Sequence, residues 1–221
     1  MDRAIRVDEV QSSAREANAP IGDESARLLA RYLDLVRGPG MKIRVISKAT
    51  RASLLRRHLT DSLVGVGILD GLVPEVGEPI VLDIGSGGGF PGMVTGVARP
   101  RWQVHLAESN SRRAGFLLSV VERLGLANVR VRPGRAEEAE IRGSLVTARA
   151  VAPLDDLLPV ALRCVIPGGY LVFWKGASAA RELEKAGPVM DGLGLTVRSR
   201  HRYYLPGEEI SREIIVLGVE G

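Results

Sequence analysis

Cysteine and histidine are scarce in this chain, and their scarcity excludes two kinds of chemistry. Of 221 residues, one is cysteine and three are histidine. The single cysteine, Cys164, cannot form a disulfide within the chain. Neither it nor the scattered histidines supply the ligand cluster that a metal site needs. We therefore expect no internal disulfide and no metal centre.

The sequence also lacks a long apolar run. Asp83 interrupts the longest candidate, so no segment reaches the length that crosses a bilayer. The first ten residues carry three acids, Asp2, Asp8 and Glu9, and lack the apolar core of a signal peptide. These features predict a cytoplasmic protein without membrane contact, and we expect it to act as a monomer.

Positive charge is present but unevenly distributed. Residues 1–60 carry 12 Lys/Arg and 7 acids, and residues 99–150 carry 10 Arg and 5 acids, so each segment has a net charge of +5. Residues 61–98, which lie between them, carry 5 acids and no basic residue. Basic segments suit a polyanion such as nucleic acid. Solvated helix faces in an arginine-rich chain would give the same pattern.

Hydrophobic periodicity predicts the elements. Residues 4–37 are expected to form two helices broken at 18–22, and residues 50–72 a further amphipathic helix. From Pro79 onward, buried strands alternate with helices. The expected strands are 80–84, 103–107, 129–132, 145–150, 170–174, 197–204 and 214–219, and the expected helices begin at Pro91 and cover 111–124, 154–165 and 178–190.

This alternation is typical of a doubly wound α/β fold. The last two strands are joined through Pro206 and Gly207 without a helix, which predicts an antiparallel final strand. We expect a Rossmann-like, seven-stranded, mostly parallel sheet in residues 73–221, as one compact unit. An N-terminal helical extension, residues 1–72, precedes it.

The strongest local signal is the segment VLDIGSGGGFPG, in which a buried strand ends in an acid and opens into glycines. Glycines permit tight turns and close approach of a ligand. The dinucleotide fingerprint requires glycine where Phe90 stands, and the phosphate loop requires a lysine that is absent. The spacing is instead similar to the S-adenosylmethionine loop of methyltransferases, whose cofactor has no phosphate and carries an ammonium suited to this acidic block. The candidate cofactor residues are Asp83, Gly85, Gly87, Gly89 and Phe90.

Three residues after later strands extend this candidate site. Glu108 ends the second strand and is positioned to accept both ribose hydroxyls, a role that it would equally have in a dinucleotide enzyme. Ala136 and Glu137 follow the third strand, where the adenine edge would lie. A polar connection without a ligand explains these two residues as well.

Basic residues end the fourth and fifth strands. Arg149 is a candidate for holding a cofactor carboxylate or an RNA phosphate as a bidentate pair, with an ion pair to Asp155 or Asp156 as the structural alternative. Lys175 is a candidate of the same kind. His58 is included as a catalytic candidate, although a hydrogen-bonded pair with Asp61 on a helix face explains it too.

Two motifs of nucleic-acid methyltransferases are absent. The chain has no Pro-Cys nucleophile of the kind used at cytosine carbon and no Asn/Asp-Pro-Pro-Tyr/Phe motif of the kind that holds an exocyclic amine. A target with an available lone pair, such as guanine N7, needs neither. Positioning against the methyl group can then supply most of the catalysis.

Together these motifs resemble the bacterial family of ribosomal RNA small-subunit methyltransferase G, also called glucose-inhibited division protein B. The resemblance covers roughly residues 25–219 and rests on segments 57–62, 83–92, 108–117, 135–138, 148–152 and 175–176. It implies S-adenosylmethionine-dependent methylation of guanine N7 in 16S ribosomal RNA, with that RNA or the small ribosomal subunit as the partner. The implied cofactor contacts are Gly85, Phe90, Ala136, Glu137 and Arg149, with Glu108 near the ribose.

Arg112 and Arg113, in the second basic segment, are the further candidates for RNA contact beside Lys175. The stretch 37–47 departs from the asparagine-rich sequence of many family members. RNA contacts that this stretch makes in those members therefore cannot be assigned to this chain. Three alternatives stay open: a methyltransferase of the same fold acting on a small molecule or a protein, an NAD-dependent oxidoreductase, and a non-catalytic RNA-binding domain.

Overall fold

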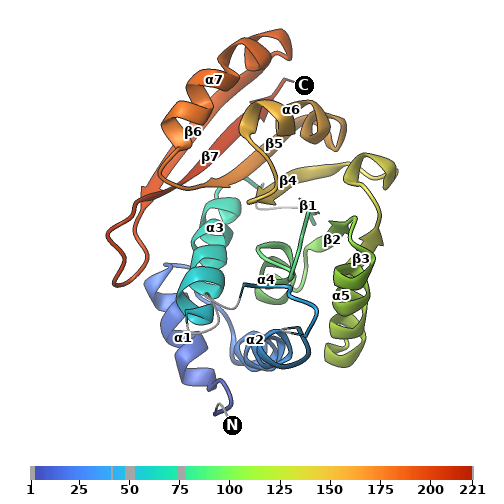
Figure 1. The fold of residues 1–221 in the computed structure, drawn as a ribbon, viewed down its shortest axis with the longest axis vertical. Coiled ribbons are helices and arrows are strands. Elements are labelled where there is room, and N and C mark those ends of the chain that lie inside the picture. The colour runs from blue at the N-terminus through green and yellow to red at the C-terminus, as the bar shows by residue number, and fades with distance from the viewer. Residues whose placement is uncertain (1–2, 41, 48–52, 74–77, 221) are drawn as a thin grey trace.

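A seven-stranded sheet forms the centre of the structure, a computed structural model that describes residues 3–40, 42–47, 53–73 and 78–220 (Figure 1). The spatial order of the strands is β3-β2-β1-β4-β5-β7-β6. Strands β1 to β5 pair in parallel, and β7 runs antiparallel to both β5 and β6. The strands are β1 (Ile80–Ile84), β2 (Gln103–Glu108), β3 (Val129–Pro133), β4 (Gly143–Arg149), β5 (Val165–Lys175), β6 (Leu195–Tyr203) and β7 (Arg212–Val219).

This topology confirms the expected fold class, including the antiparallel last strand. The strand order reverses between β1 and β4. In open sheets of this kind, a crevice for ligands forms outside the carboxyl ends of the strands at that reversal. The site is therefore expected where β1 and β4 end.

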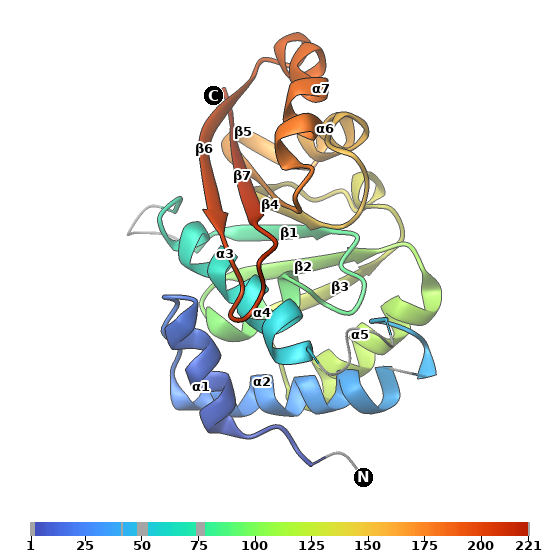
Figure 2. The same cartoon turned by 60° about the vertical axis from the view of Figure 1, so that its left-hand side comes forward.

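Helices cover both faces of the sheet (Figure 2). Alternate residues of β1 belong to different apolar clusters, Val81 to the cluster with the N-terminal helices and Leu82 to the cluster with the later helices. One face carries α6 (Leu154–Arg163) and α7 (Ala179–Gly192). The other face carries α3 (Asp61–Asp70), α4 (Gly92–Ala98) and α5 (Ser111–Leu124). Outside these helices, α2 (Asp23–Leu35) packs against α4 and α5, and α1 (Val7–Glu16) packs against α2.

Local signals account for several helix ends. The side chain of Asn110 accepts hydrogen bonds from the backbone amides of Arg112 and Arg113 and so caps the start of α5. Gly125 ends that helix at a φ of 65°. The predicted break at 18–22 is confirmed, because α1 ends at Glu16 and α2 begins at Asp23.

The helix expected over 50–72 differs from the prediction. Residues 50–52 lie outside the described part of the chain, Leu55–Thr60 is a π-helical turn, and α3 then runs to Asp70. The hydroxyl of Thr60 donates to the Leu55 carbonyl (3.1 Å), and the hydroxyl of Ser62 donates to the His58 carbonyl (2.6 Å). Such hydroxyls compete with backbone amides for helix carbonyls, and π turns of this kind recur at functional sites.

Several strand boundaries also differ: β4 begins at Gly143, β6 spans Leu195–Tyr203 and β7 begins at Arg212. Strand β5 begins at Val165 rather than at residue 170, because Val165 pairs with Gly143 across an irregularity in the ladder. Strand β4 ends at Arg149, since Ala150 adopts a positive φ of 55° that a strand does not permit. Within the described residues, none of the helices combines the length and the apolar character required of a membrane span.

Helix α3 approaches the sheet at a glycine. A Cβ atom at Gly65 would overlap the indole ring of Trp174 on β5, so the close packing of α3 on β5 depends on the missing side chain. Gly115 on α5 is exposed and has no atom within 4 Å of its ideal Cβ position.

We predict opposite effects on stability at these two helical glycines. Gly65→Ala should lower the free energy of unfolding by about 1–3 kcal/mol, because the added methyl overpacks the α3–β5 contact. Gly115→Ala should raise it by about 0.5–1 kcal/mol, because alanine is the better helix former. Urea denaturation measures both, and a stabilised Gly65→Ala protein would contradict the packing described here.

Candidate functional site

Three glycines with positive φ shape the loop after β1. The φ angles of Gly85, Gly87 and Gly89 are 64°, 58° and 102°, values that other residues rarely adopt. At Gly85 an added Cβ would also lie 2.8 Å from Cγ2 of Val151. The loop can therefore turn beside the segment that follows β4 only because it carries no side chains here.

Asp83 lies beneath this loop and is fully buried. Its Oδ1 accepts a hydrogen bond from the hydroxyl of Thr147 on β4 (2.8 Å), and its Oδ2 accepts one from the amide of Gly92 (3.2 Å). Burial raises the pKa of Asp83 to about 6, against the opposing effect of these hydrogen bonds. The carboxylate thus ties the start of α4 to β1 and β4, and it lines neither of the two pockets described below.

Glu108 holds the other side of the loop. Its Oε2 accepts a hydrogen bond from the amide of Gly87 (2.7 Å), its Oε1 accepts one from the amide of Asn110 (2.8 Å), and the residue is 4% exposed. Each carboxylate oxygen keeps a second lone pair. In the structure, Glu108 orders the loop through these two hydrogen bonds. The ribose contact that was predicted for Glu108 from the sequence stays a prediction.

A tyrosine from the N-terminal helices, which was not among the residues predicted from the sequence, supports the same loop. The hydroxyl of Tyr32 on α2 donates to the carbonyl of Gly88 (2.6 Å), and its ring packs against Phe90 with ring centroids 5.3 Å apart. The available signal was a tyrosine within an apolar helix face, because a buried hydroxyl requires a partner.

A first pocket of about 330 Å³ opens where β1, β2 and β3 end. Three predicted cofactor residues line it: Gly85 from the loop, and Ala136 and Glu137 from the short 3₁₀ turn after β3. Most of the remaining wall is apolar. Among the described lining residues, Arg135 is the only basic one, whereas Glu137 and Asp156 are acidic. Gly87, Gly89 and Glu108 do not line this pocket; Glu108 holds the loop through the amide of Gly87.

A second pocket of about 370 Å³ lies at the ends of β4 and β5 and the start of β7. Val151 and Ala152 line both pockets, so the two adjoin across the turn that follows Arg149. The polar residues of the second pocket are Asp61, Arg149, Lys175, Glu182, Tyr203 and Arg212, with Trp174 beside them.

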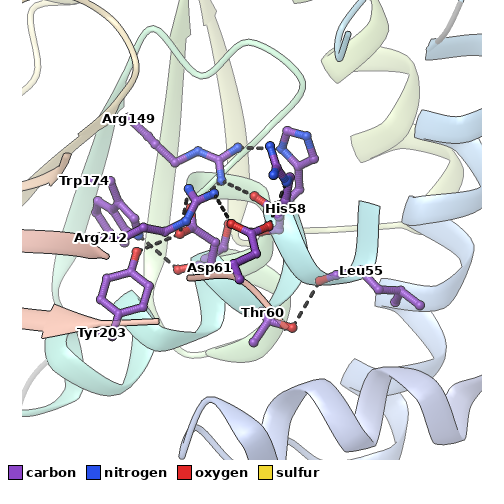
Figure 3. Close-up of polar contacts among 11 residues, drawn as sticks. Leu55, His58, Thr60, Asp61, Arg149, Trp174, Tyr203 and Arg212 are labelled. Atoms are coloured by element: carbon purple, nitrogen blue, oxygen red, sulfur yellow. Dashed lines mark hydrogen bonds and ion pairs between the residues drawn. The ribbon is translucent and has the colours of Figure 1, made fainter. Parts of the chain in front are cut away.

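Arg149 points toward the helical segment that precedes α3 (Figure 3). Its guanidinium donates to Oδ2 of Asp61 (2.7 Å), to the carbonyl of Arg57 (3.2 Å) and to Nδ1 of His58 (2.7 Å). Its Cζ atom lies 5.5 Å from the ring centre of Phe90. Arginine has five N–H donors, so two have no partner within the described part of the chain.

The structural alternative for Arg149, an ion pair, is present, but the partners named for it, Asp155 and Asp156, were wrong. Asp155 pairs with Lys185 (2.7 Å), and the carboxylate that meets Arg149 is Asp61, 88 residues away in the sequence. The alternative of a His58–Asp61 pair on one helix face is also wrong, because both side chains contact Arg149 instead.

His58 is held as a neutral imidazole. Burial, followed by the charges of Arg149, Arg212 and Arg57, lowers the pKa of His58 to about 3. Since arginine only donates, Nδ1 of His58 is the acceptor and the proton is on Nε2. Nε2 is buried and has no hydrogen-bond partner within the described residues. His58 is therefore no base, and it lines neither of the two pockets.

The three predicted RNA-binding residues do not lie together. Lys175 is 8% exposed, pairs with Glu182 (2.8 Å) and donates to the carbonyl of Ala152 (3.0 Å), so it holds the turn between the pockets. Arg112 and Arg113 are exposed on the first turn of α5. Among the residues that the structure describes, none of the His, Cys, Asp and Glu side chains forms a group of three or more able to hold a metal ion.

Comparison with known proteins gives consistent results. Residues 25–203 match the model of a family described as rRNA small subunit methyltransferase G. A protein of that name from Salinispora arenicola is 50% identical over 123 residues, covering 52% of this chain and 51% of the relative. One from Nitrosomonas europaea is 37% identical over 148 residues, covering 66% of this chain and 65% of the relative. The chain thus spans between half and two thirds of the length of these relatives.

Solved structures are similar in fold. TrmN from Thermus thermophilus has a TM-score of 0.55 at 19% identity, covering 72% of this chain and 48% of that chain. The ribosomal protein L11 methylase from Lactobacillus delbrueckii subsp. bulgaricus has a TM-score of 0.54 at 14% identity, covering 73% and 78%. Such identities establish the architecture and leave the substrate to be argued from the site.

The Tyr32–Gly88 hydrogen bond gives a prediction about the loop. Tyr32→Phe should lower the free energy of unfolding by about 1–3 kcal/mol, because it leaves a buried carbonyl without its donor. Tyr204→Phe removes the same hydroxyl from a residue that is 60% exposed and should change stability by less than about 0.5 kcal/mol. Chemical denaturation compares the two, and equal stabilities would argue against support of the loop by α2.

Proposed function

The chain belongs to the family of rRNA small subunit methyltransferase G, and we propose that it transfers the methyl group of S-adenosylmethionine to N7 of a guanine in 16S ribosomal RNA. The observation that carries the proposal is the adjacency of two different pockets. The first suits an adenosine, the second presents cationic groups, and both share Val151 and Ala152 as a wall. Two reactants bound on either side of this turn would meet at the ends of β1 and β4.

The first pocket fits the cofactor by its chemistry. Its wall is mostly apolar, as an adenine ring requires, and among its described residues two acids outnumber one basic side chain, which suits a cationic ligand without phosphates. The close approach of Gly85 to Val151 leaves no space for a side chain beside the ligand. We assign Gly85, Ala136 and Glu137 to direct contact, and Asp83, Gly87, Gly89 and Glu108 to holding the loop. Phe90 connects this loop to Arg149.

The proposed reaction needs little proton chemistry from the protein. When bound, S-adenosylmethionine supplies a methyl group on a cationic sulfur. The N7 lone pair of guanine forms the new N–C bond, the electrons of the S–C bond remain on sulfur, and the positive charge moves to the base without loss of a proton. Positioning is then the main task of the residues. We assign the two N–H groups of Arg149 that have no partner among the described residues to an anionic oxygen, either the carboxylate of the cofactor or a phosphate of the RNA.

The RNA substrate, as naked 16S RNA or as the small subunit, is supported by charge. Residues 99–150 carry a net charge of +5, and Arg112 and Arg113 are exposed on the first turn of α5, directly after the strand that ends in Glu108. We assign these two arginines to the phosphate backbone. Lys175 contributes to the wall of the second pocket.

Cofactor binding is the first test. S-adenosylmethionine should bind stoichiometrically in calorimetry, and Gly85→Ala should weaken binding by at least about tenfold, because the new methyl meets Val151 and narrows the pocket. Gly168→Ala is the matched control, since Gly168 has a φ of 74° and no atom within 4 Å of its ideal Cβ position. That variant carries the same kind of backbone strain and should keep wild-type affinity. If the protein bound NAD and did not bind S-adenosylmethionine, the proposed function would be wrong.

Methyl transfer is the second test. Labelled methyl groups should appear in 16S RNA, and nucleoside mass spectrometry should identify 7-methylguanosine. Arg112→Glu with Arg113→Glu should weaken RNA binding by about tenfold or more without changing cofactor affinity, because two phosphate contacts become repulsive.

The control for this double variant reverses two exposed arginines near the other end of α5: Arg123 on α5 itself and Arg31 on the neighbouring α2. Arg31→Glu with Arg123→Glu makes the same change in net charge where the side chain of Arg31 reaches the Arg123 carbonyl. RNA affinity should be reduced much less in this variant. Equal losses in the two double variants would mean that net charge, and not a site on α5, governs RNA binding. If the labelled methyl group appeared in protein or in a small molecule instead of RNA, the proposal of an RNA substrate would be wrong.

A further inference from the structure

Asp61 joins the N-terminal helices to the ends of four strands. It is the first residue of α3 and is 1% exposed. Its Oδ2 accepts from Arg149 at the end of β4, and its Oδ1 accepts from the hydroxyl of Tyr203 at the end of β6 (2.6 Å). Arg212 at the start of β7 approaches Oδ1 at 3.5 Å, and the backbone carbonyl of Asp61 accepts from the indole of Trp174 on β5 (3.0 Å; Figure 3).

The carboxylate lies behind its cationic partners. The side chains of Arg149 and Arg212 are 15% and 25% exposed, compared with 1% for Asp61. Asp61 forms part of the wall of the second pocket, but a ligand that enters it would contact mainly the more exposed guanidinium groups. Asp61 would therefore act on a substrate mainly through the groups that it holds.

Tyr203 serves as a fixed donor in this arrangement. Burial, the negative charge of Asp61 and the hydrogen bond between them all raise the pKa of Tyr203. The hydroxyl consequently stays protonated and donates to Oδ1. With Trp174 holding the backbone carbonyl, Asp61 is restrained at both its main chain and its side chain.

We propose that Asp61 is the positioning residue of the second pocket, which aligns Arg149 and Arg212 for the RNA substrate and offsets part of their charge. The inference rests on the proposed function. Methyl transfer to N7 leaves a positive charge on the base, and an uncompensated Arg149 at the pocket would oppose that charge, whereas Arg212 also pairs with Glu208 (3.2 Å). A carboxylate behind them reduces the repulsion and fixes the direction in which their remaining donors point.

Asp61→Asn tests the proposal with little change in size. At saturating cofactor and RNA, the single-turnover rate of methyl transfer should fall by about 100-fold, the loss expected when a reacting pair is misplaced by about 1 Å. The effect should appear in the rate of the chemical step more than in KM for RNA. Asp155→Asn, which removes a carboxylate paired with the exposed Lys185, is the matched control and should react at the wild-type rate.

A double-mutant cycle separates positioning from a general structural role. If Asp61 acts mainly through Arg149, then adding Asp61→Asn to Arg149→Ala should lower the rate by less than about threefold further, because the nearer of the two guanidinium groups (2.7 Å, compared with 3.5 Å for Arg212) is already missing. A merely structural effect would repeat in both backgrounds. A full 100-fold further loss in the Arg149→Ala background overturns the proposal, as does an Asp61→Asn rate within threefold of wild type.

Tyr203→Phe covers the case in which Asp61→Asn does not fold. It removes one donor to Oδ1 and leaves the buried charge paired with both arginines, so the protein should fold with a melting temperature only a few degrees below that of the wild type. The single-turnover rate should nevertheless fall several-fold, and an unchanged rate would overturn the proposal. Failure of the proposed function is distinguishable, because the wild-type protein would then bind no S-adenosylmethionine and methylate no RNA.

Discussion

The buried ion pair between Asp61 and Arg149 is the contact on which the arrangement of the site depends. A carboxylate that is 1% exposed requires close positive partners, and removing one partner of a buried pair typically costs about 3–5 kcal/mol. Here the pair also joins two parts of the chain. Asp61 belongs to the first helix after the π-helical turn, whereas Arg149 ends β4. The N-terminal helices therefore have one defined position relative to the carboxyl ends of the strands, and the second pocket exists only in that position.

The glycine loop is a second constraint, and it is ordered by groups from three directions. Asp83 holds it from below, Glu108 holds it from the side of β2, and Tyr32 holds the carbonyl of Gly88 from α2. A glycine-rich loop has a large conformational entropy to lose on binding a ligand. Because these three side chains order the loop beforehand, less of that entropy cost remains for the binding step.

The fold could be predicted from the sequence more completely than the site. Strands β1 and β2 and the glycine loop are local features, in which a buried apolar run ends in an acid or in glycines. Arg149 could be placed at the mouth of the crevice because it ends a buried strand. Its partner could not be predicted, since Asp61 is 88 residues away and depends on how α3 packs over Trp174. The same reason applies to Tyr32, which is 56 residues from the carbonyl that it contacts.

The titratable groups of the site argue for a target that keeps its protons. His58 is neutral, and its acceptor nitrogen is occupied by Arg149. Asp83 is sealed below the loop, both oxygens of Glu108 accept from backbone amides, and Glu182 in the second pocket pairs with Lys175. Each of these groups has a fixed partner, so none is poised to remove a proton from a substrate. Methylation of an exocyclic amine releases a proton, whereas methylation of guanine N7 does not. None of these groups is a prepared base, which agrees with the guanine N7 target proposed above.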